Sequence, residues 1–132
     1  MSHIEAVQNI YAAFGRQDIP FILERLAADV EWEYAYRDEG VPWLQPRRGR
    51  EQVLGFFQSL AGLELRRFEL KRLLGDGDLV VALFDVEGVA RQTGRHYVER
   101  DEVHLWYFNE RGLVQRFRHV VDTLQQWRTL HP

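Results

Sequence analysis

The sequence contains no cysteine, which excludes disulfide bonds, thiolate nucleophiles and cysteine-based zinc or iron–sulfur sites. It also lacks any apolar run near the roughly 20 residues that a membrane span needs. Residues 1–5 show no basic stretch that leads into an apolar segment. We therefore expect no signal peptide, no membrane partner and a cytoplasmic location.

A basic excess is missing as well, because the net charge is −3, with 17 basic and 20 acidic residues. Nucleic-acid-binding domains usually carry an excess of positive charge, so we expect no nucleic-acid partner. Neither a glycine-rich phosphate loop nor a serine nucleophile motif is present. Hydrophobic residues make up 45% of the 132 residues, which is enough for one packed core. We therefore expect a single domain that spans residues 1–132.

Hydrophobic spacing predicts three helices in the first half of the chain. A capping box of Ser2 and Glu5 opens the first helix, and Gly15 ends it. Asp18 caps a short second helix, and the third spans residues 50–60. Alternating or apolar segments bounded by turn residues predict five strands. These strands cover residues 30–36, 63–74, 79–90, 96–108 and 113–122.

The order of these elements defines the expected fold. Four consecutive strands joined by hairpin turns form an antiparallel meander, and the helices then gather on one face of the sheet. We therefore predict an α+β fold in which a curved, cone-shaped antiparallel sheet packs on three N-terminal helices. The open end of such a cone is a natural ligand site.

Four local sequences carry a resemblance to a known superfamily. They are Tyr11-Ala-Ala-Phe14, Leu-Ala-Ala-Asp-Val-Glu-Trp at residues 26–32, Gly49-Arg50-Glu51, and the stretch at residues 112–123. In this order and spacing the chain resembles the nuclear-transport-factor-two-like superfamily, in particular its SnoaL-like and ketosteroid-isomerase-like branches. The resemblance implies the cone fold. The superfamily includes isomerases, cyclases, dehydratases and binding proteins, so the fold does not choose the chemistry.

The isomerase branch can be compared with this chain residue by residue. Its tyrosine of the first helix aligns with Ile10, its general-base aspartate with Tyr34, and its protonated aspartate with His104. None of the three is retained, so we do not expect a ketosteroid isomerase. The SnoaL-like cyclases are similar to this chain in ending the last strand with an aspartate, here Asp122. They use acid–base chemistry without a metal or cofactor, and the resemblance implies the same here.

Strand alternation predicts which side chains share the pocket face. A turn at residues 110–111 pairs His104 with Phe117 and Glu102 with His119. A turn at residues 93–94 pairs Asp85 with Glu102. The shared face then carries Val81, Leu83, Asp85, Glu87, Arg100, Glu102, His104, Trp106, Phe117, His119 and Val121. The resemblance places this face on the helix side of the sheet.

A polar cluster at the centre of this face supplies the candidate catalytic residues. Its members are Asp85, Glu102, His104 and His119. A carboxylate beside an imidazole favours the charged imidazole, and such groups can move a proton from one substrate atom to another. A buried ion-pair network that only fixes the register is the alternative. Tyr34 and Asp122 are further catalytic candidates, although Asp122 could instead cap the chain that follows it.

The same cluster raises the question of a metal. Two histidines with Glu102 have suitable ligand types for a two-histidine, one-carboxylate site. No H-E-x-x-H motif or comparable spacing appears, however, and we predict no metal and no cofactor.

Aromatic residues supply the candidate substrate-binding surface, which would suit a ring-shaped ligand. The candidates are Tyr11, Phe14, Trp32, Trp43, Trp106 and Phe117. Alternation also places Tyr34 and Tyr36 beside Trp32 on one face of the first strand. Ordinary aromatic core is the alternative for each of these residues.

The opposite sheet face is also apolar, and we expect a second subunit to cover it in a homodimer. It carries Phe84, Val86, Val103, Leu105 and Tyr107. Together these features predict a cofactor-independent acid–base enzyme of the isomerase, cyclase or dehydratase type. Its ligand would be a small apolar molecule that is cyclic or bears a carbonyl. A small-ligand-binding protein without chemistry and a dimeric interaction module are the alternatives.

Overall fold

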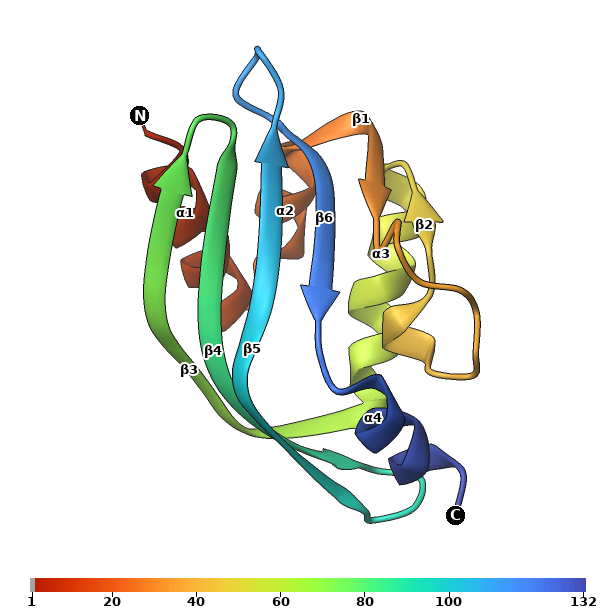
Figure 1. Cartoon of the computed structure of the whole chain (residues 1–132). Helices are drawn as coiled ribbons and strands as arrows, with labels where there is room; N and C mark the ends of the chain where they lie inside the picture. The colour runs from red at the N-terminus through yellow and green to blue at the C-terminus, as the bar shows by residue number, and fades with distance from the viewer. Residues whose placement is uncertain (1) are drawn as a thin grey trace.

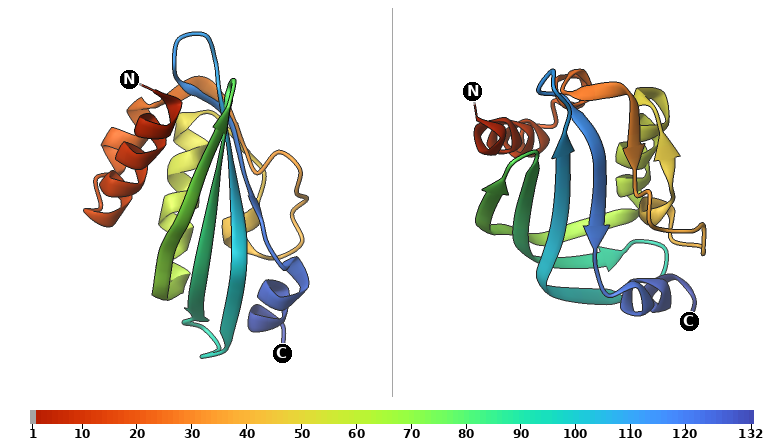
Figure 2. Two further views of the ribbon diagram at one scale, coloured as in Figure 1. Left: turned by 60° about the vertical axis from the view of Figure 1, so that its left-hand side comes forward. Right: turned by 45° about the horizontal axis from the view of Figure 1, so that its top comes forward.

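Three helices lie on one face of a curved sheet in the computed structural model, which describes residues 2–132 (Figures 1 and 2). Helix α1 (His3–Gly15) begins at Ser2, whose hydroxyl accepts a hydrogen bond from the Glu5 amide, as the capping box predicts. Helix α2 (Ile19–Glu24) begins at Asp18 in the same way. Helix α3 (Arg50–Ser59) completes the layer. No helix within residues 2–132 has both the length and the apolar character to cross a bilayer.

The sheet has six strands in the order β2-β1-β6-β5-β4-β3. The strands are β1 (Leu26–Trp32), β2 (Arg47–Arg48), β3 (Leu63–Asp76), β4 (Leu79–Ala90), β5 (His96–Phe108) and β6 (Val114–Val120). Strands β3 to β6 form the predicted antiparallel meander. Strand β1 joins this meander by pairing parallel with β6, so the sheet is mixed. The α+β class and the curved, open sheet are confirmed.

A short strand, a 3-10 turn and a C-terminal helix lie outside the predicted set. The short strand β2 pairs with β1 at Trp32 and Arg47, and a 3-10 turn, η1 (Pro42–Leu44), precedes it. Helix α4 (Thr123–Leu130) follows β6 and packs against the lower end of the sheet (Figure 1). The Asp122 carboxylate accepts a hydrogen bond from the Gln125 amide 3.0 Å away and so caps α4. The capping role is the alternative that the sequence left open for Asp122.

The first strand ends earlier than its alternation predicts. After Trp32, the backbone of Glu33 takes a left-handed conformation with φ of 55°, which few residues other than glycine adopt. The chain therefore leaves the sheet before Tyr34 and Tyr36, and the prediction that these tyrosines share a strand face with Trp32 is wrong. The same bend turns the Glu33 side chain into the interior, where it is fully buried.

The β5–β6 register differs from the predicted one by two residues. His104 pairs with His119, and Trp106 pairs with Phe117. A shift by an even number of residues keeps each side chain on its predicted face. These four side chains therefore share the helix-facing side of the sheet, as predicted, and Leu105 lies on the outer side.

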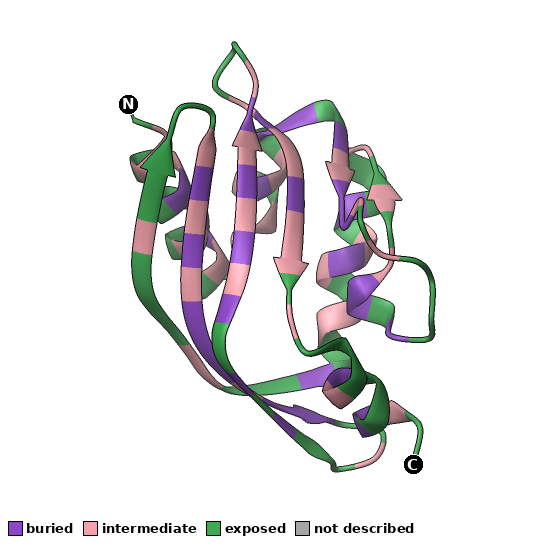
Figure 3. Cartoon of the chain, viewed as in Figure 1, coloured by how far each residue is buried: buried purple, intermediate pink, exposed green. Residues whose placement is uncertain are grey.

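The β4–β5 register differs by one residue, which exchanges the two faces of β4. Ala82 pairs with His104, and Phe84 pairs with Glu102. The prediction that Asp85 lies on the pocket face is therefore wrong, as is the placement of Phe84 and Val86 on the outer face. Val81 and Leu83 take the outer positions instead. Figure 3 shows the resulting alternation of buried and partly exposed residues along β4, β5 and β6.

Aromatic rings fill the space between the sheet and the helices. Trp32 stacks on Phe117 with ring centroids 4.0 Å apart, and Phe68 stacks on Phe84 at 4.3 Å. Tyr11 of α1 meets Phe84 edge-on at 4.8 Å. This aromatic layer positions the polar groups described next.

Candidate functional site

A cavity lies between the sheet and the helices, with walls from α1, α3, η1, α4 and the inner sheet face. It contains about 680 Å³ of space between atoms, counting the part at its mouth that opens to solvent. All six predicted substrate-binding residues line it: Tyr11, Phe14, Trp32, Trp43, Trp106 and Phe117. Three of the predicted catalytic residues also line it: Glu102, His104 and His119. No lysine or arginine within residues 2–132 contributes to its walls.

A continuous chain of hydrogen bonds crosses one wall of the cavity. The Trp106 indole N–H donates to the Tyr11 hydroxyl oxygen at 2.9 Å. The Tyr11 oxygen lies 2.6 Å from His104 Nδ1, and His104 Nε2 lies 2.6 Å from a carboxylate oxygen of Glu102. His104 therefore has both ring nitrogens engaged, and its side chain is only 3% exposed.

One arrangement of protons along this series of hydrogen bonds gives every donor an acceptor. The Tyr11 hydroxyl donates to His104 Nδ1, and the neutral imidazole donates from Nε2 to an ionised Glu102. Burial, helped by the nearby His119, lowers the pKa of His104 and so favours its neutral form. Burial alone would raise the pKa of Glu102, but the hydrogen bond from His104 holds this pKa below its usual range. Burial raises the pKa of Tyr11, which keeps its proton.

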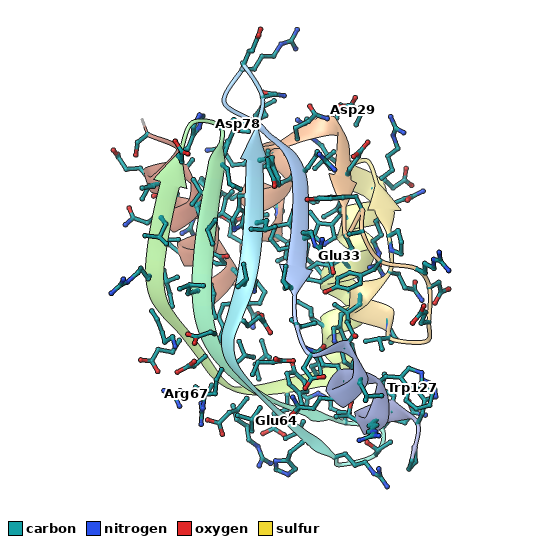
Figure 4. All side chains as sticks on the ribbon, in the orientation of Figure 1. Asp29, Glu33, Glu64, Arg67, Asp78 and Trp127 are labelled. Atoms are coloured by element: carbon teal, nitrogen blue, oxygen red, sulfur yellow. The ribbon has the colours of Figure 1, made fainter. Side chains whose placement is uncertain are left out.

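A second pair, His119 and Glu33, lies beside this chain. One Glu33 oxygen accepts hydrogen bonds from the His119 amide at 2.7 Å and from His119 Nδ1 at 2.9 Å. Burial opposes a charge on His119, but the Glu33 carboxylate outweighs it and raises the pKa of His119 above the usual value. The second Glu33 oxygen is buried and has no hydrogen-bond partner within residues 2–132. Figure 4 labels Glu33 beside β6.

The two pairs meet at a point on the cavity wall. The His104 and His119 rings lie 4.5 Å apart and nearly perpendicular. One ligating atom from each of Glu102, His104 and His119 lies within 4.8 Å of the other two. His119 Nε2 and the second Glu102 oxygen have no hydrogen-bond partner within residues 2–132. The site thus contains one potential donor and one potential acceptor that are not engaged within the protein, on residues that line the cavity.

The far end of the cavity is closed by residues that are distant in sequence. The Trp43 indole N–H donates to the Gln126 side-chain oxygen at 2.7 Å. The Gln126 side-chain nitrogen donates to Glu99 at 3.1 Å, and Glu99 also accepts from the Asp122 amide at 3.1 Å. Burial raises the pKa of Glu99 above its usual range. This network holds η1 and α4 together and fixes Trp43 in the wall.

Three predicted catalytic residues lie away from the cavity. Asp85 contacts Lys71 at 3.0 Å and Arg67 at 3.5 Å on the outer face, and Figure 4 shows Arg67 well removed from Glu33. Tyr34 packs under the Arg116 guanidinium, which is 3.9 Å from the ring centroid. Asp122 caps α4. The structure therefore does not bring these three together with His104.

Two polar residues of the site were absent from the sequence prediction. Glu33 alternates with Trp32 along a strand-like segment, so its sequence placed it on the outer face. Only the left-handed backbone at Glu33 brings it inside, and neither glycine nor asparagine marks that turn. Gln126 lies on α4, which the sequence analysis did not predict. An Asp122-to-Gln125 capping signal before an amphipathic segment was the available clue.

Residues 7–117 match the family model of the SnoaL-like domain, and the chain therefore belongs to the SnoaL-like family. No curated protein matches the chain in sequence. An NTF2-like protein of unknown function from Burkholderia pseudomallei is 27% identical, with a TM-score of 0.82 and coverage of 100% of both chains. TerC, co-crystallised with polyporic acid, is 25% identical, with a TM-score of 0.77 and 98% coverage of both chains.

A more distant structure extends the fold comparison. IdmH of Streptomyces antibioticus, described as a candidate polyketide cyclase, is 20% identical, with a TM-score of 0.70 and coverage of 100% of both chains. At this identity the likeness concerns the fold alone. The family match and the structural likeness together establish the SnoaL-like, NTF2-like fold of the chain.

Proposed function

We propose that this protein is an acid–base enzyme for a small, mostly apolar molecule that is cyclic or bears a carbonyl. The observation that carries the proposal is the cluster of Glu102, His104 and His119 on the wall of an aromatic cavity, in which His119 Nε2 and one Glu102 oxygen have no hydrogen-bond partner within residues 2–132. A fold without a functional demand gains little from such a cluster, because burying charged groups is costly even when they are paired.

The two free atoms have complementary roles in this proposal. Glu102 accepts a proton from a substrate carbon next to a carbonyl, and the C–H electron pair moves onto the carbonyl oxygen. His119 Nε2–H donates a hydrogen bond to that oxygen as its negative charge develops. Return of the proton to another carbon gives an isomerisation, loss of hydroxide from the next carbon gives a dehydration, and attack on a second carbonyl gives a cyclisation.

The other cavity residues hold these two groups and the ligand in place. His104 donates to Glu102 and keeps the carboxylate ionised, and Tyr11 fixes the His104 ring through Nδ1. The six aromatic side chains offer flat surfaces to a planar ligand. TerC was co-crystallised with polyporic acid. This supports an organic ring compound as the ligand class of the present protein.

Hydrogen–deuterium exchange tests this proposal without knowledge of the natural substrate. The protein, treated with a chelator, is incubated in D₂O with a panel of one- to three-ring cyclic ketones, and loss of the α-proton NMR signals is followed. At least one ketone is expected to exchange about 10²-fold faster, or more, than in buffer. Glu102→Gln should remove this acceleration, because the amide cannot accept the proton.

Glu87→Gln is the matched control, since Glu87 is a half-exposed carboxylate in a surface ion pair with Arg67. It should exchange ketones at the wild-type rate. Ketones that quench tryptophan fluorescence on binding but show no accelerated exchange would favour the alternative, a ligand-binding protein without chemistry.

We also propose that two copies of the chain pair through the outer sheet face. The residues that support this are partly exposed and apolar: Val81, Leu83, Val103, Leu105 and Tyr107. Leu105→Glu places a charge at the centre of this face and is expected to convert a dimer into a monomer in light scattering at micromolar concentration. Leu124→Glu, on exposed α4, should leave the mass unchanged. A wild-type monomer would contradict the proposal.

A further inference from the structure

We propose that Glu102, His104 and His119 also form a binding site for a divalent transition-metal ion of the zinc type. Their ligand atoms lie within 4.8 Å of one another at the cavity wall, and two histidines with one carboxylate are a ligand set suited to such ions. This inference goes beyond the proposed function, because proton transfer by these residues requires no ion.

The orientation of the two imidazole rings is the first observation behind the site. Histidines that bind a metal through one ring nitrogen usually hydrogen-bond through the other to a carboxylate or another oxygen. His119 Nδ1 lies 2.9 Å from Glu33, and His104 Nδ1 lies 2.6 Å from the Tyr11 hydroxyl. Both Nδ1 atoms are thus engaged, and His104 Nε2 already lies 2.6 Å from Glu102. Because the Tyr11 hydroxyl donates to His104 Nδ1 in the metal-free protein, metal binding through His104 Nε2 requires the ring proton to move to Nδ1, where it donates to the Tyr11 oxygen.

The balance of charge is the second observation. The cluster contains two buried carboxylates, Glu33 and Glu102, which are 0% and 6% exposed. No lysine or arginine within residues 2–132 lines the cavity beside Glu102; Arg47 interacts electrostatically with Glu33, and in the absence of an ion the raised pKa of His119 favours a positive charge on that ring. A divalent cation bound by Glu102 and two neutral histidines, with Glu33 behind His119, brings the formal charge of the cluster to zero. Desolvated carboxylates favour such compensation.

Distances decide which kind of ion fits. Tetrahedral zinc holds nitrogen and oxygen ligands at about 2.0–2.2 Å, so two ligand atoms lie roughly 3.4 Å apart. His104 Nε2 and Glu102 must open from 2.6 Å, and His119 must approach from at most 4.8 Å. These are side-chain movements beside an open cavity. Calcium and magnesium prefer six or more oxygen ligands, which the site does not supply.

A bound ion would occupy His104 Nε2, and the proton on that nitrogen would move to Nδ1 so that the imidazole stays neutral. The ion would also occupy His119 Nε2, so the ion and the proposed proton transfer exclude one another. Zinc is therefore expected to inhibit the exchange reaction and to be removed by a chelator.

Titration of the full chain with Co²⁺ and Zn²⁺, followed by visible absorption and by calorimetry, tests the site. The expected result is one ion per chain, with Co²⁺ absorption bands of low coordination number. Glu102→Gln and His119→Asn should abolish the bands. Glu33→Gln, which alters only the support behind His119, should weaken binding by about 10–100-fold. Circular dichroism establishes that each variant is folded.

His96→Asn is the matched control, because His96 is exposed on β5 and far from the cluster in the strand. It should bind as the wild type does. No ion uptake by the wild-type chain, or uptake that survives Glu102→Gln and His119→Asn but not His96→Asn, would overturn the inference. The titration needs no substrate and the exchange assay is run with chelator, so either proposal can fail alone.

Discussion

His104→Leu is expected to lower the free energy of unfolding by about 3–5 kcal/mol, because it leaves one member of a buried polar pair without its partner. Glu102 has its hydrogen bond from His104 at 2.6 Å, and its side chain is only 6% exposed. The Tyr11 hydroxyl loses its acceptor at the same time. Urea unfolding at pH 7, compared with the wild type, measures the effect.

The double variant His104→Leu/Glu102→Leu distinguishes the cost of an unpaired Glu102 from any contribution of the whole pair to stability. Replacing both members of a buried pair by apolar residues is often neutral or stabilising, so much of the lost stability should return. A single variant as stable as the wild type would mean that Glu102 gains no stability from His104. A double variant less stable than the single would mean that the cluster is needed for the fold itself.

Glu33→Gln is expected to lower the free energy of unfolding by about 2–3 kcal/mol near pH 5.5, because charge-assisted hydrogen bonds to His119 are lost. Glu33 raises the pKa of His119, and Glu102 adds to this effect. A raised histidine pKa stabilises the fold fully below the unfolded pKa of about 6.5, and this stabilisation is lost as the pH rises through the folded pKa. The difference between wild type and variant should therefore shrink toward pH 9.

Glu31→Gln is the matched control, two residues earlier in β1. Its carboxylate pairs with Arg116 at 3.3 Å, and both side chains are more than 40% exposed. Exposed pairs of this kind contribute about 0–1 kcal/mol, so this variant should be close to the wild type at every pH. If Glu33→Gln changed the free energy of unfolding no more than Glu31→Gln does, or if its effect did not depend on pH, the proposed ion pair between Glu33 and His119 would be contradicted.

Strand alternation was sufficient to predict the inner face of β5 and β6. The predicted pairing was wrong by two residues, yet His104, Trp106 and His119 still share the cavity, because side chains repeat every two residues. Of the aromatic residues that line the cavity, Trp106 and Phe117 also follow from strand alternation, whereas Tyr11 and Phe14 lie on α1 and Trp43 lies on η1. Which β5 and β6 side chains line the cavity therefore depends on the sheet face they occupy, and not on the residue with which each one pairs.

The positions of Asp85 and Glu33 depend on local backbone irregularities that the residue types do not reveal. The β4–β5 ladder shifts register beside Asp101, whose φ is 60°, and Asp85 lies on the outer face. Glu33 turns into the protein interior because its own backbone is left-handed. Each irregularity moves one acidic residue from the expected face to the other, and composition cannot show this. Three of the four predicted members therefore lie together, namely Glu102 and His104 on β5 and His119 on β6. Asp85 lies elsewhere, and Glu33 contacts His119 instead.

The end wall of the cavity has a consequence for how this protein can diversify. Gln126 on α4 holds Trp43 in place, yet α4 lies beyond the segment of residues 7–117 that matches the family model. Changes in α4 can therefore alter the length and polarity of the cavity without disturbing the Glu102–His104–His119 cluster on the sheet. Selection for a new ligand could act on this C-terminal helix while the chemistry stayed the same, and libraries that vary residues 123–130 would be the direct way to retarget the pocket.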